Sequence, residues 1–236
     1  MPSKSTLTAF RRSIIAWFKK HGRDLPWRRT RDPYRIVVSE FMLQQTQVSR
    51  VEGFYHRFLE RYPDLETLAR ATPRMVRESW EGLGYYRRAA NLHALAQTVH
   101  ADQDGVIPQD VERLRALPGI GRYTAGAVAT FAYEAAEPAV DTNVARVLRR
   151  AFHPRAGKKA RDEEKLWKTA QALVPRAGAG AWSFNQGIME LGAVICTARE
   201  ARCGECPVVR SCSTGRRTLK AGRSLPRSKT PSRKDR

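Results

Sequence analysis

Residues 114–128 read LRALPGIGRYTAGAV and give the first indication of the fold. Pro118 ends one helical stretch because it lacks an amide hydrogen, and Gly119 and Gly121 permit positive φ and a close backbone approach. The amides that open the next helix can then face an anion such as a phosphate. The stretch predicts a hairpin between two helices that binds a phosphodiester backbone. Taken alone, a PGIG segment is more typical of an ordinary turn.

Helical periodicity extends outward from this hairpin over most of the chain. Apolar residues recur three and four positions apart in the N-terminal segment from Leu7 to Phe18 and in segments 36–59, 75–99, 123–133, 143–152, 163–174 and 184–195. Proline and glycine separate these segments, and alternating strand-like runs are scarce. The pattern predicts a compact all-α fold with short connections and no internal repeat.

Size and charge limit the class of protein. The chain has 236 residues, 42% of them hydrophobic, which suffices for one large domain or two small lobes. A formal net charge of +20 favours a polyanionic partner such as nucleic acid, although a solvated basic surface gives the same count. No apolar run is long enough to cross a membrane, and the N-terminus lacks the apolar core of a secretory signal. We expect a cytoplasmic protein with no membrane partner.

The composition changes at Gly215. Residues 215–236 hold nine Lys or Arg against one Asp, with few large apolar side chains. Such a segment buries too little surface to offset its ordering entropy, so it predicts a disordered basic tail. The tail either adds non-specific phosphate contacts or only improves solubility.

Four cysteines are grouped in one segment. They are Cys196, Cys203, Cys206 and Cys212, with the spacing C-x6-C-x2-C-x5-C. In a reducing compartment, grouped thiols favour a metal or cluster site over disulfides. Thiolates suit both zinc and iron–sulfur clusters, but paired zinc sites usually show two short Cys-x2-Cys turns and this segment has one. Four reduced cysteines without metal are the remaining alternative.

Two carboxylates stand inside otherwise apolar stretches, Glu40 in SEFMLQQTQV and Asp141 in AVDTNVARVLRR. Buried carboxylates are costly unless they are paired or functional. Each stretch also has a simpler interpretation, since Asp141 and Ser39 can cap the helices that follow them. With the hairpin between them in sequence, the pair favours catalysis. One carboxyl can protonate a leaving group while the other stabilises positive charge, as in sugar hydrolysis.

Several motifs occur in a specific order. These are LPWRRTRDPYRIVVSEFMLQQTQV, GLGYYRRAANL, LPGIGRYTAGAVA, VDTNVARVL, FNQGIMELGAVIC and the four-cysteine loop. Over roughly residues 8–214 they resemble the catalytic domain of MutY-type adenine DNA glycosylases, in the superfamily of endonuclease III. The resemblance implies a two-lobed helix-hairpin-helix glycosylase fold. It also implies a monomeric hydrolase of base excision repair that acts on double-stranded DNA containing a mismatched or damaged base.

The resemblance also implies catalytic roles. Glu40 resembles the general acid that protonates the departing adenine, and Asp141 resembles the carboxylate that stabilises or transiently bonds to the sugar. Tyr123 falls beside the reacting sugar, and Asn143 falls where a residue orients the acid and the water. Lyase members carry a lysine at the position of Tyr123. Because Tyr123 has no amine for a Schiff base, we expect weak strand cleavage at most.

Further residues fall where the family contacts DNA. Trp27, Arg29 and Gln186 fall in the pocket for the flipped base, Gln45 and Tyr85 fall where side chains wedge into the stack, and Leu117, Gly119, Gly121 and Arg122 form the hairpin. Core packing is the alternative for Trp27 and Tyr86. Gln44, Gln45 and Gln47 are expected on the helix that carries Glu40. The four cysteines are expected to hold a [4Fe-4S] cluster with a structural and electrostatic role.

Two features leave the substrate open. MutY-type enzymes continue into a second domain that reads 8-oxoguanine, and here the basic tail follows Cys212, so we expect that domain to be missing. The segment PWRRTRDPY also resembles the thymine/uracil mismatch glycosylases. The first hypothesis is adenine excision opposite G or 8-oxoguanine, the second is thymine or uracil excision opposite G, and the third is DNA binding without catalysis.

The expected domain organisation follows from the resemblance. Residues 1–214 form the catalytic domain and 215–236 the tail. A six-helix lobe covers about 30–135, and the N-terminal helix joins 136–214 in a second lobe with the cysteines. We expect a DNA cleft between the lobes, with Glu40 and Asp141 on opposite sides of one pocket.

Overall fold

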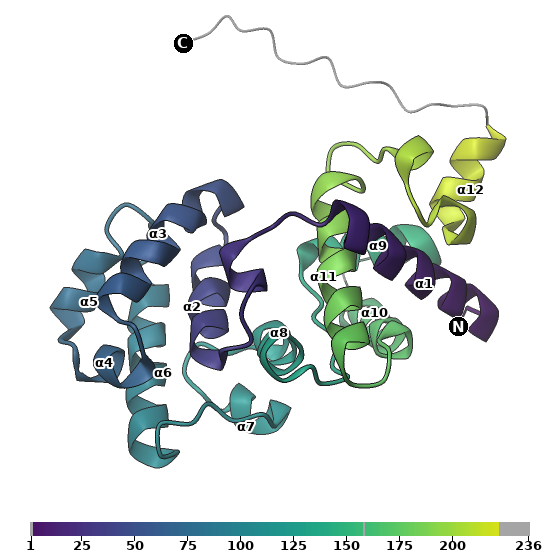
Figure 1. Ribbon diagram of the computed structural model, residues 1–236. Helices are drawn as coiled ribbons and strands as arrows, with labels where there is room; N and C mark the ends of the chain where they lie inside the picture. The colour runs from purple at the N-terminus through teal and green to yellow at the C-terminus, as the bar shows by residue number, and fades with distance from the viewer. Residues whose placement is uncertain (1, 158, 222–236) are drawn as a thin grey trace, which may run out of the picture. The chain divides into compact units, whose positions relative to one another are not determined.

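The computed structural model describes residues 2–157 and 159–221 and is helical throughout (Figure 1). In these residues no strand forms, and the one β-bridge joins Cys196 to Ala201. Two compact units are present. Unit 1 combines Met1–Gly22, Val140–Pro175 and the chain from Ser183 onward, and unit 2 combines Arg23–Ala139 with Arg176–Trp182. No described helix is both long and apolar enough to cross a membrane.

Unit 2 holds a short 3-10 helix, η1 (Pro26–Arg28), and seven α-helices. These are α2 (Pro33–Leu43), α3 (Val48–Arg61), α4 (Leu65–Arg70), α5 (Pro73–Ser79), α6 (Arg87–Asp102), α7 (Val111–Arg115) and α8 (Arg122–Tyr133). Helices α3, α6 and α8 all pack against α2, and α7 packs against α8. Every residue of α8 from Thr124 to Ala132 is buried. Helices α2 and α8 therefore form the centre of the unit.

Local sequence explains where these helices begin. The side chains of Asp32, Asp64, Thr72 and Asp110 each accept a hydrogen bond from an amide in the first turn of the helix that follows. Such N-caps satisfy amides that have no partner within the helix. Proline adds to the signal at the first position of α2 and α5, where its missing amide costs nothing.

Unit 1 packs the N-terminal helix against the C-terminal half of the chain. It contains α1 (Lys4–His21), α9 (Thr142–Phe152), α10 (Ala160–Leu173), most of α11 (Ala179–Val194), the 3-10 turns η2 (Cys203–Glu205) and η3 (Val209–Ser211), and α12 (Ser213–Lys220). A Cβ on Gly187 would lie 2.8 Å from Ile14 Cγ2, and one on Gly192 would lie 2.8 Å from Asn143 Cβ. Both glycines therefore let α11 approach its neighbours closely.

Three expectations about the helices need correction. The periodic segments 36–59 and 75–99 are each split, with a turn at Gln44–Gln47 and another at Trp80–Tyr86. Gln44, Gln45 and Gln47 therefore lie outside the helix that carries Glu40. Unit 2 also has seven helices instead of six, because α7 forms a separate single turn that leads into the hairpin.

Part of the segment expected to be a disordered tail is helical. Residues Ser213–Lys220 form α12, whose first turn is tied to the rest of unit 1. Thr214 Oγ1 donates to the carbonyl oxygen of Arg150 at 2.7 Å, and the buried Gly215 donates from its amide to Cys212 Sγ at 3.3 Å. These contacts stabilise α12 and offset the conformational entropy lost when it orders. The amino-acid composition of the segment did not indicate them. Residues 222–236 lie outside the described residues.

Candidate active site and cysteine loop

The hairpin between α7 and α8 uses its two glycines for different reasons. Gly119 has φ +76°, and a Cβ there would lie 2.7 Å from Asn91 Cβ and 2.9 Å from Phe41 Cε1. Gly121 has extended backbone, is the N-cap of α8, and has open space where a Cβ would stand. Leu117 is buried and anchors the turn, and Arg122 is exposed at the start of α8. The hairpin thus presents a helix N-terminus, the type of site that binds phosphate.

Helix α8 brings Tyr123 to Glu40 on α2. The phenol of Tyr123 donates a hydrogen bond to Glu40 Oε2 at 2.8 Å. Glu40 is only 4% exposed, and Tyr123 is half-buried. A buried carboxylate with a hydrogen-bond donor beside it can exchange a proton with a bound group while water is largely excluded.

The alternative in which Ser39 caps a helix containing Glu40 is wrong. Asp32 caps α2, and Ser39 lies seven residues into that helix, where its hydroxyl donates to the carbonyl oxygen of Ile36 at 2.7 Å. Eight of the eleven residues of α2 are buried, Glu40 among them. The rigid, buried helix fixes the position of the Glu40 carboxylate.

Asp141 is the N-cap of α9, so its capping role is real. Its Oδ1 accepts from the amide of Val144 at 2.7 Å, and its Oδ2 accepts from Asn143 Nδ2 at 2.8 Å. Burial raises the pKa of the Asp141 carboxyl, while these donors and nearby Arg146 oppose the rise. The same hydrogen bonds that cap α9 hold the Asp141 carboxylate in place and favour its ionised form. The capping role is therefore compatible with a chemical role.

Arg146 links Asn143 to the segment that contains the first cysteine. Its Nη2 donates to Asn143 Oδ1 at 2.8 Å and to the carbonyl oxygen of Gly192 at 2.6 Å, and its Nε donates to the carbonyl oxygen of Cys196 at 2.8 Å. Burial lowers the pKa of Arg146. The guanidinium therefore connects Asp141, through Asn143, to the backbone of the cysteine loop.

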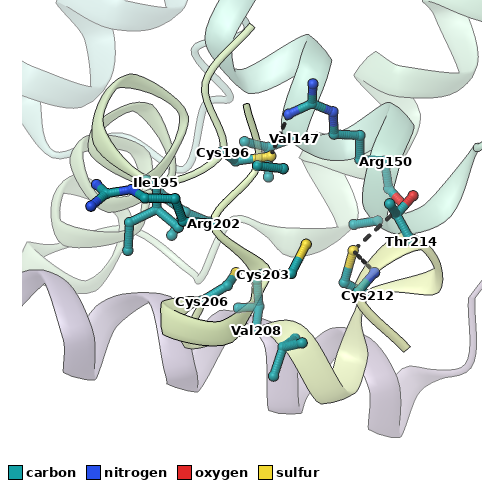
Figure 2. Close-up of a pocket in the computed structure, with 15 residues that line it drawn as sticks. Val147, Arg150, Ile195, Cys196, Arg202, Cys203, Cys206, Val208, Cys212 and Thr214 are labelled. Atoms are coloured by element: carbon teal, nitrogen blue, oxygen red, sulfur yellow. Dashed lines mark hydrogen bonds between the residues drawn. The ribbon is translucent and has the colours of Figure 1, made fainter. Parts of the chain in front are cut away.

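The four cysteines line one cavity of unit 1, together with apolar side chains such as Val147, Leu191 and Ile195. Figure 2 shows their side chains around this space. All four thiols are free of disulfides. Arg150 Nη1 donates to Cys196 Sγ at 3.2 Å and to the carbonyl oxygen of Thr197 at 2.7 Å.

The protein donors at this cavity are four cysteine thiols. Within the described residues, no three His, Cys, Asp or Glu side chains converge closely enough to hold one metal ion. Zinc needs all its sulfur ligands about 2.3 Å from one point, whereas a cluster takes one thiolate on each of several irons. Burial raises the pKa of the Cys206 thiol to about 12, and it also raises the pKa of the Cys203 and Cys212 thiols.

The three residues predicted for a base pocket lie in different surroundings. Trp27 is buried edge-on against Tyr55, with ring centroids 5.5 Å apart. Arg29 is exposed, and its Nε donates to Asp24 Oδ1 at 2.8 Å. Gln186 is buried in the part of α11 that belongs to unit 1. Trp27 therefore packs in the core of unit 2, as the alternative interpretation expected. Arg29 forms a surface ion pair, which does not support a role in a buried pocket.

Gln45 and Tyr85 share an unusual backbone conformation. Both lie in turns of unit 2 and have positive φ, +56° for Gln45 and +50° for Tyr85. Both side chains are exposed, Tyr85 to 60%. Residues other than glycine adopt this conformation rarely, and they do so mostly where the surroundings enforce it.

Three functional candidates were missed from the sequence. Glu190 is 1% exposed on α11, one helical turn after Gln186, and stands in an apolar stretch like the one that drew attention to Glu40. Arg146 and Arg88 are arginines whose importance depends on distant carbonyl partners, so no local signal marks them.

The helical fold with a glycine hairpin and a buried carboxylate beside it defines a helix-hairpin-helix protein. The described chain superposes on a trapped endonuclease III–DNA covalent intermediate with a TM-score of 0.76, covering 93% of this chain and 100% of that one at 23% identity. At that identity the likeness shows the fold alone. The family model described as "HhH-GPD superfamily base excision DNA repair protein" matches residues 38–172, and the chain belongs to this family.

Relatives with two different names are similar to the chain. The adenine DNA glycosylase of Mycolicibacterium smegmatis is 48% identical over 83% of this chain and 66% of its own length, and the human adenine DNA glycosylase is 42% identical over 89% of this chain and 40% of its own length. The thymine-DNA glycosylase of Aeropyrum pernix is 40% identical over 87% of this chain and 93% of its own length. A solved thermostable thymine-DNA glycosylase superposes with a TM-score of 0.82 at 31% identity, covering 90% of this chain and 98% of that one.

The chain spans slightly less than two thirds of the Mycolicibacterium relative and of the adenine DNA glycosylase of Mycobacterium tuberculosis, of which it matches 64%.

Proposed function

We propose that the protein is a DNA glycosylase of base excision repair that hydrolyses the N-glycosidic bond of adenine mispaired with G or 8-oxoguanine. The observation that carries this proposal is the hydrogen bond from Tyr123 to the buried Glu40, beside a hairpin of the HhH-GPD family. The adenine DNA glycosylases that are 42–48% identical support adenine as the base.

The chain's own residues supply the chemistry. A protonated Glu40 donates its proton to the leaving adenine, which weakens the glycosidic bond. Asp141, held by Val144 and Asn143, provides a carboxylate that stabilises positive charge on the sugar. Tyr123 orients Glu40 and carries a phenol where an amine would be needed for a Schiff base. Water then adds to C1′ of the sugar and releases a proton. Because no Schiff base forms, the product is an abasic site in a strand that stays intact.

The partner in this proposal is double-stranded DNA that contains the mismatch. Gly119, Gly121 and Arg122 hold a phosphate at the N-terminus of α8, without reading sequence. Gln45 and Tyr85 enter the base stack when the target base leaves it, because chemistry on a paired base requires flipping. The folded protein acts as a monomer.

The four cysteines hold a [4Fe-4S] cluster in the cavity of unit 1. The support is the set of four free thiols around one apolar cavity. The cluster supplies a fixed structural centre and local charge. The loop that holds it carries Arg199, Arg202 and Arg210, which provide phosphate contacts.

A second candidate substrate has its own support. The thymine-DNA glycosylase of Aeropyrum pernix matches over 93% of its length, and the solved thymine-DNA glycosylase has the TM-score of 0.82. These similarities favour excision of thymine or uracil opposite G. The same acid and carboxylate chemistry serves a pyrimidine, so the site residues do not separate the two candidates.

Base release from labelled duplexes tests the proposal. Duplexes with A:8-oxoguanine, A:G, T:G and U:G pairs are incubated with the protein, with and without later alkali. Release of adenine, with strand breaks only after alkali, is the expected result. Release of thymine or uracil instead supports the second candidate. Strand breaks without alkali contradict the monofunctional mechanism.

Two variants separate catalysis from binding. Glu40→Gln and Asp141→Asn remove the proton donor and the carboxylate while keeping the shape of each side chain. Each should lower the rate of base release by about 100-fold or more, the usual effect of losing a general acid or its equivalent. DNA affinity should change little. Unchanged rates in both variants would contradict the assignment, and binding without release in the unmodified protein would favour a non-catalytic DNA-binding protein.

A further inference from the structure

Arg88 is a buried arginine that lies between the two turns that carry Gln45 and Tyr85. It is the second residue of α6 and is 7% exposed. Burial lowers its pKa. A buried guanidinium is expensive unless its donors are used, so its partners indicate what it does.

On one side, Arg88 binds the end of α2. Its Nη1 donates to the carbonyl oxygen of Phe41 at 3.1 Å and to that of Met42 at 2.7 Å, and it also donates to the carbonyl oxygen of Gln44. The last carbonyls of a helix have no partner within it. Arg88 satisfies two of them, and α2 ends at Leu43, so that only its C-cap Gln44 separates the helix from Gln45.

On the other side, Arg88 binds the turn before α6. Its Nη2 donates to the carbonyl oxygens of Leu83 at 3.5 Å and Gly84 at 3.0 Å. Its Cζ lies 5.3 Å from the centroid of the Tyr85 ring and 5.6 Å from that of Trp80. Trp80 Nε1 donates to the same Gly84 carbonyl oxygen at 3.1 Å. Arg88 therefore contacts both the backbone before Tyr85 and the Tyr85 ring.

The two turns need this support because both contain a strained residue. Four non-glycine residues in the described chain have positive φ, and Gln45 and Tyr85 are two of them. Each directly follows a carbonyl that Arg88 binds, Gln44 before Gln45 and Gly84 before Tyr85. A strained backbone of this kind persists only when its surroundings determine it.

We propose that Arg88 is a positioning residue that holds Gln45 and Tyr85 in the geometry needed to enter the DNA base stack. This inference rests on the proposed function, and it adds a residue that need not touch DNA. The planar fork of the guanidinium binds both turns at once. A lysine ammonium, a single point of charge, cannot span the same carbonyls.

The test compares Arg88→Lys with Arg87→Lys, its exposed neighbour on α6. Hydrogen exchange on the free protein should be faster in Arg88→Lys at residues 42–47 and 83–86, and unchanged at 117–122. This arm does not depend on activity. Arg88→Gln serves as a second variant, and all proteins are measured below their own melting temperatures.

The functional arm measures base flipping by the fluorescence of 2-aminopurine placed beside the target base. Arg88→Lys should lower flipping and single-turnover base release at least about tenfold, the effect of losing one charge-assisted hydrogen bond. A duplex in which the target base is already unstacked in a bulge should recover most of the loss. In a Tyr85→Ala background, Arg88→Lys should add little further loss.

Three results would overturn the proposal. They are unchanged exchange at the two turns, an equal loss on stacked and bulged substrates, and full additivity with Tyr85→Ala. An unmodified protein that releases no base from any duplex would instead refute the proposed function. The exchange and fluorescence measurements would still decide the role of Arg88.

Discussion

The phenol of Tyr123 lies 2.8 Å from Glu40 Oε2, and 83 positions separate the two residues in the chain. This hydrogen bond joins α8, which follows the hairpin, to the buried carboxylate of α2. The Glu40 carboxylate becomes charged as it gives its proton to the leaving base, and a hydrogen bond to a charged group is worth about 1.5–3 kcal/mol. We therefore expect Tyr123→Phe to lower single-turnover base release by about 10- to 100-fold.

Tyr133→Phe is the matched control for this prediction. Tyr133 is also on α8, is also half-buried, and donates from its hydroxyl to the carbonyl oxygen of Ile107 at 2.5 Å. It should change stability slightly and leave base release within about twofold, since its hydrogen bond is to a neutral group away from Glu40. Equal losses in both variants would show that the Tyr123 hydroxyl has no special role.

The two hairpin glycines should separate stability from DNA binding. Gly119→Ala should lower the free energy of unfolding by about 2–4 kcal/mol, because its φ of +76° is strained for alanine and the new Cβ meets Asn91 and Phe41. Gly121→Ala should alter it by less than about 1 kcal/mol, because extended backbone suits alanine.

Gly121→Ala should weaken DNA binding although it barely changes the free energy of unfolding. The Cβ of Gly121→Ala meets no protein atom, but in the proposed complex it would stand where a phosphate approaches the start of α8. We expect the Kd for duplex DNA to rise by about tenfold, the loss of one charge-assisted hydrogen bond. Urea titrations and fluorescence anisotropy measure the two effects. Unchanged DNA affinity would place the phosphate elsewhere.

Asp141→Asn should stabilise the protein while it lowers activity. Burial raises the pKa of Asp141 from its ordinary value of 3.8, so the folded state binds the proton more tightly than the unfolded state does. Stability therefore falls as pH rises from the ordinary pKa through the folded pKa. Asparagine has no such charge and caps a helix as well as aspartate does.

Thermal melting across pH tests this sign. The Tm of Asp141→Asn should exceed that of the unmodified protein at neutral pH, and the difference should vanish below about pH 4, where the carboxyl is protonated in both states. A lower Tm for the variant at neutral pH would show that the hydrogen bonds from Val144 and Asn143 outweigh the cost of burying the charge.

Arg146→Lys should weaken the link between Asn143 and the cysteine loop. One ammonium cannot reach Asn143 Oδ1 and the carbonyl oxygens of Gly192 and Cys196 together. We expect a loss of about 1–3 kcal/mol in the free energy of unfolding and slower base release. Arg149→Lys is the control. Arg149 lies on the same helix as Arg146, and its buried Nε makes no hydrogen bond. Equal effects would refute the link.

Loss of one cysteine should prevent binding of the proposed cluster. Cys206→Ser should lower both iron and acid-labile sulfide in the purified protein and should destabilise the segment from η2 to α12, which surrounds the cavity. Ser211→Ala, in the same segment, should retain both. Zinc without sulfide in the unmodified protein would contradict the cluster.

Signals within a few residues of each other determined most helix starts and the hairpin. Asp32 before Pro33, and Thr72 before Pro73, cap helices through amides in the first turn, so the sequence alone marks them. The PGIG segment likewise marks the hairpin, because a glycine in a short turn after proline suits the positive φ that Gly119 adopts. The carboxylates Glu40 and Asp141 and the four cysteines were also recognisable by type and spacing.

Tertiary packing decided where α2 ends, since periodicity continues through Gln44–Gln47 and the break coincides with carbonyls bound by Arg88 from α6. It also decided that Tyr123 is the partner of Glu40 and that α12 is ordered beside Arg150. Capping and turn signals are hydrogen bonds between residues close in sequence, so they can form before the rest of the chain has packed. The guanidinium and phenol contacts join segments tens of residues apart, and they exist only once the helices have packed.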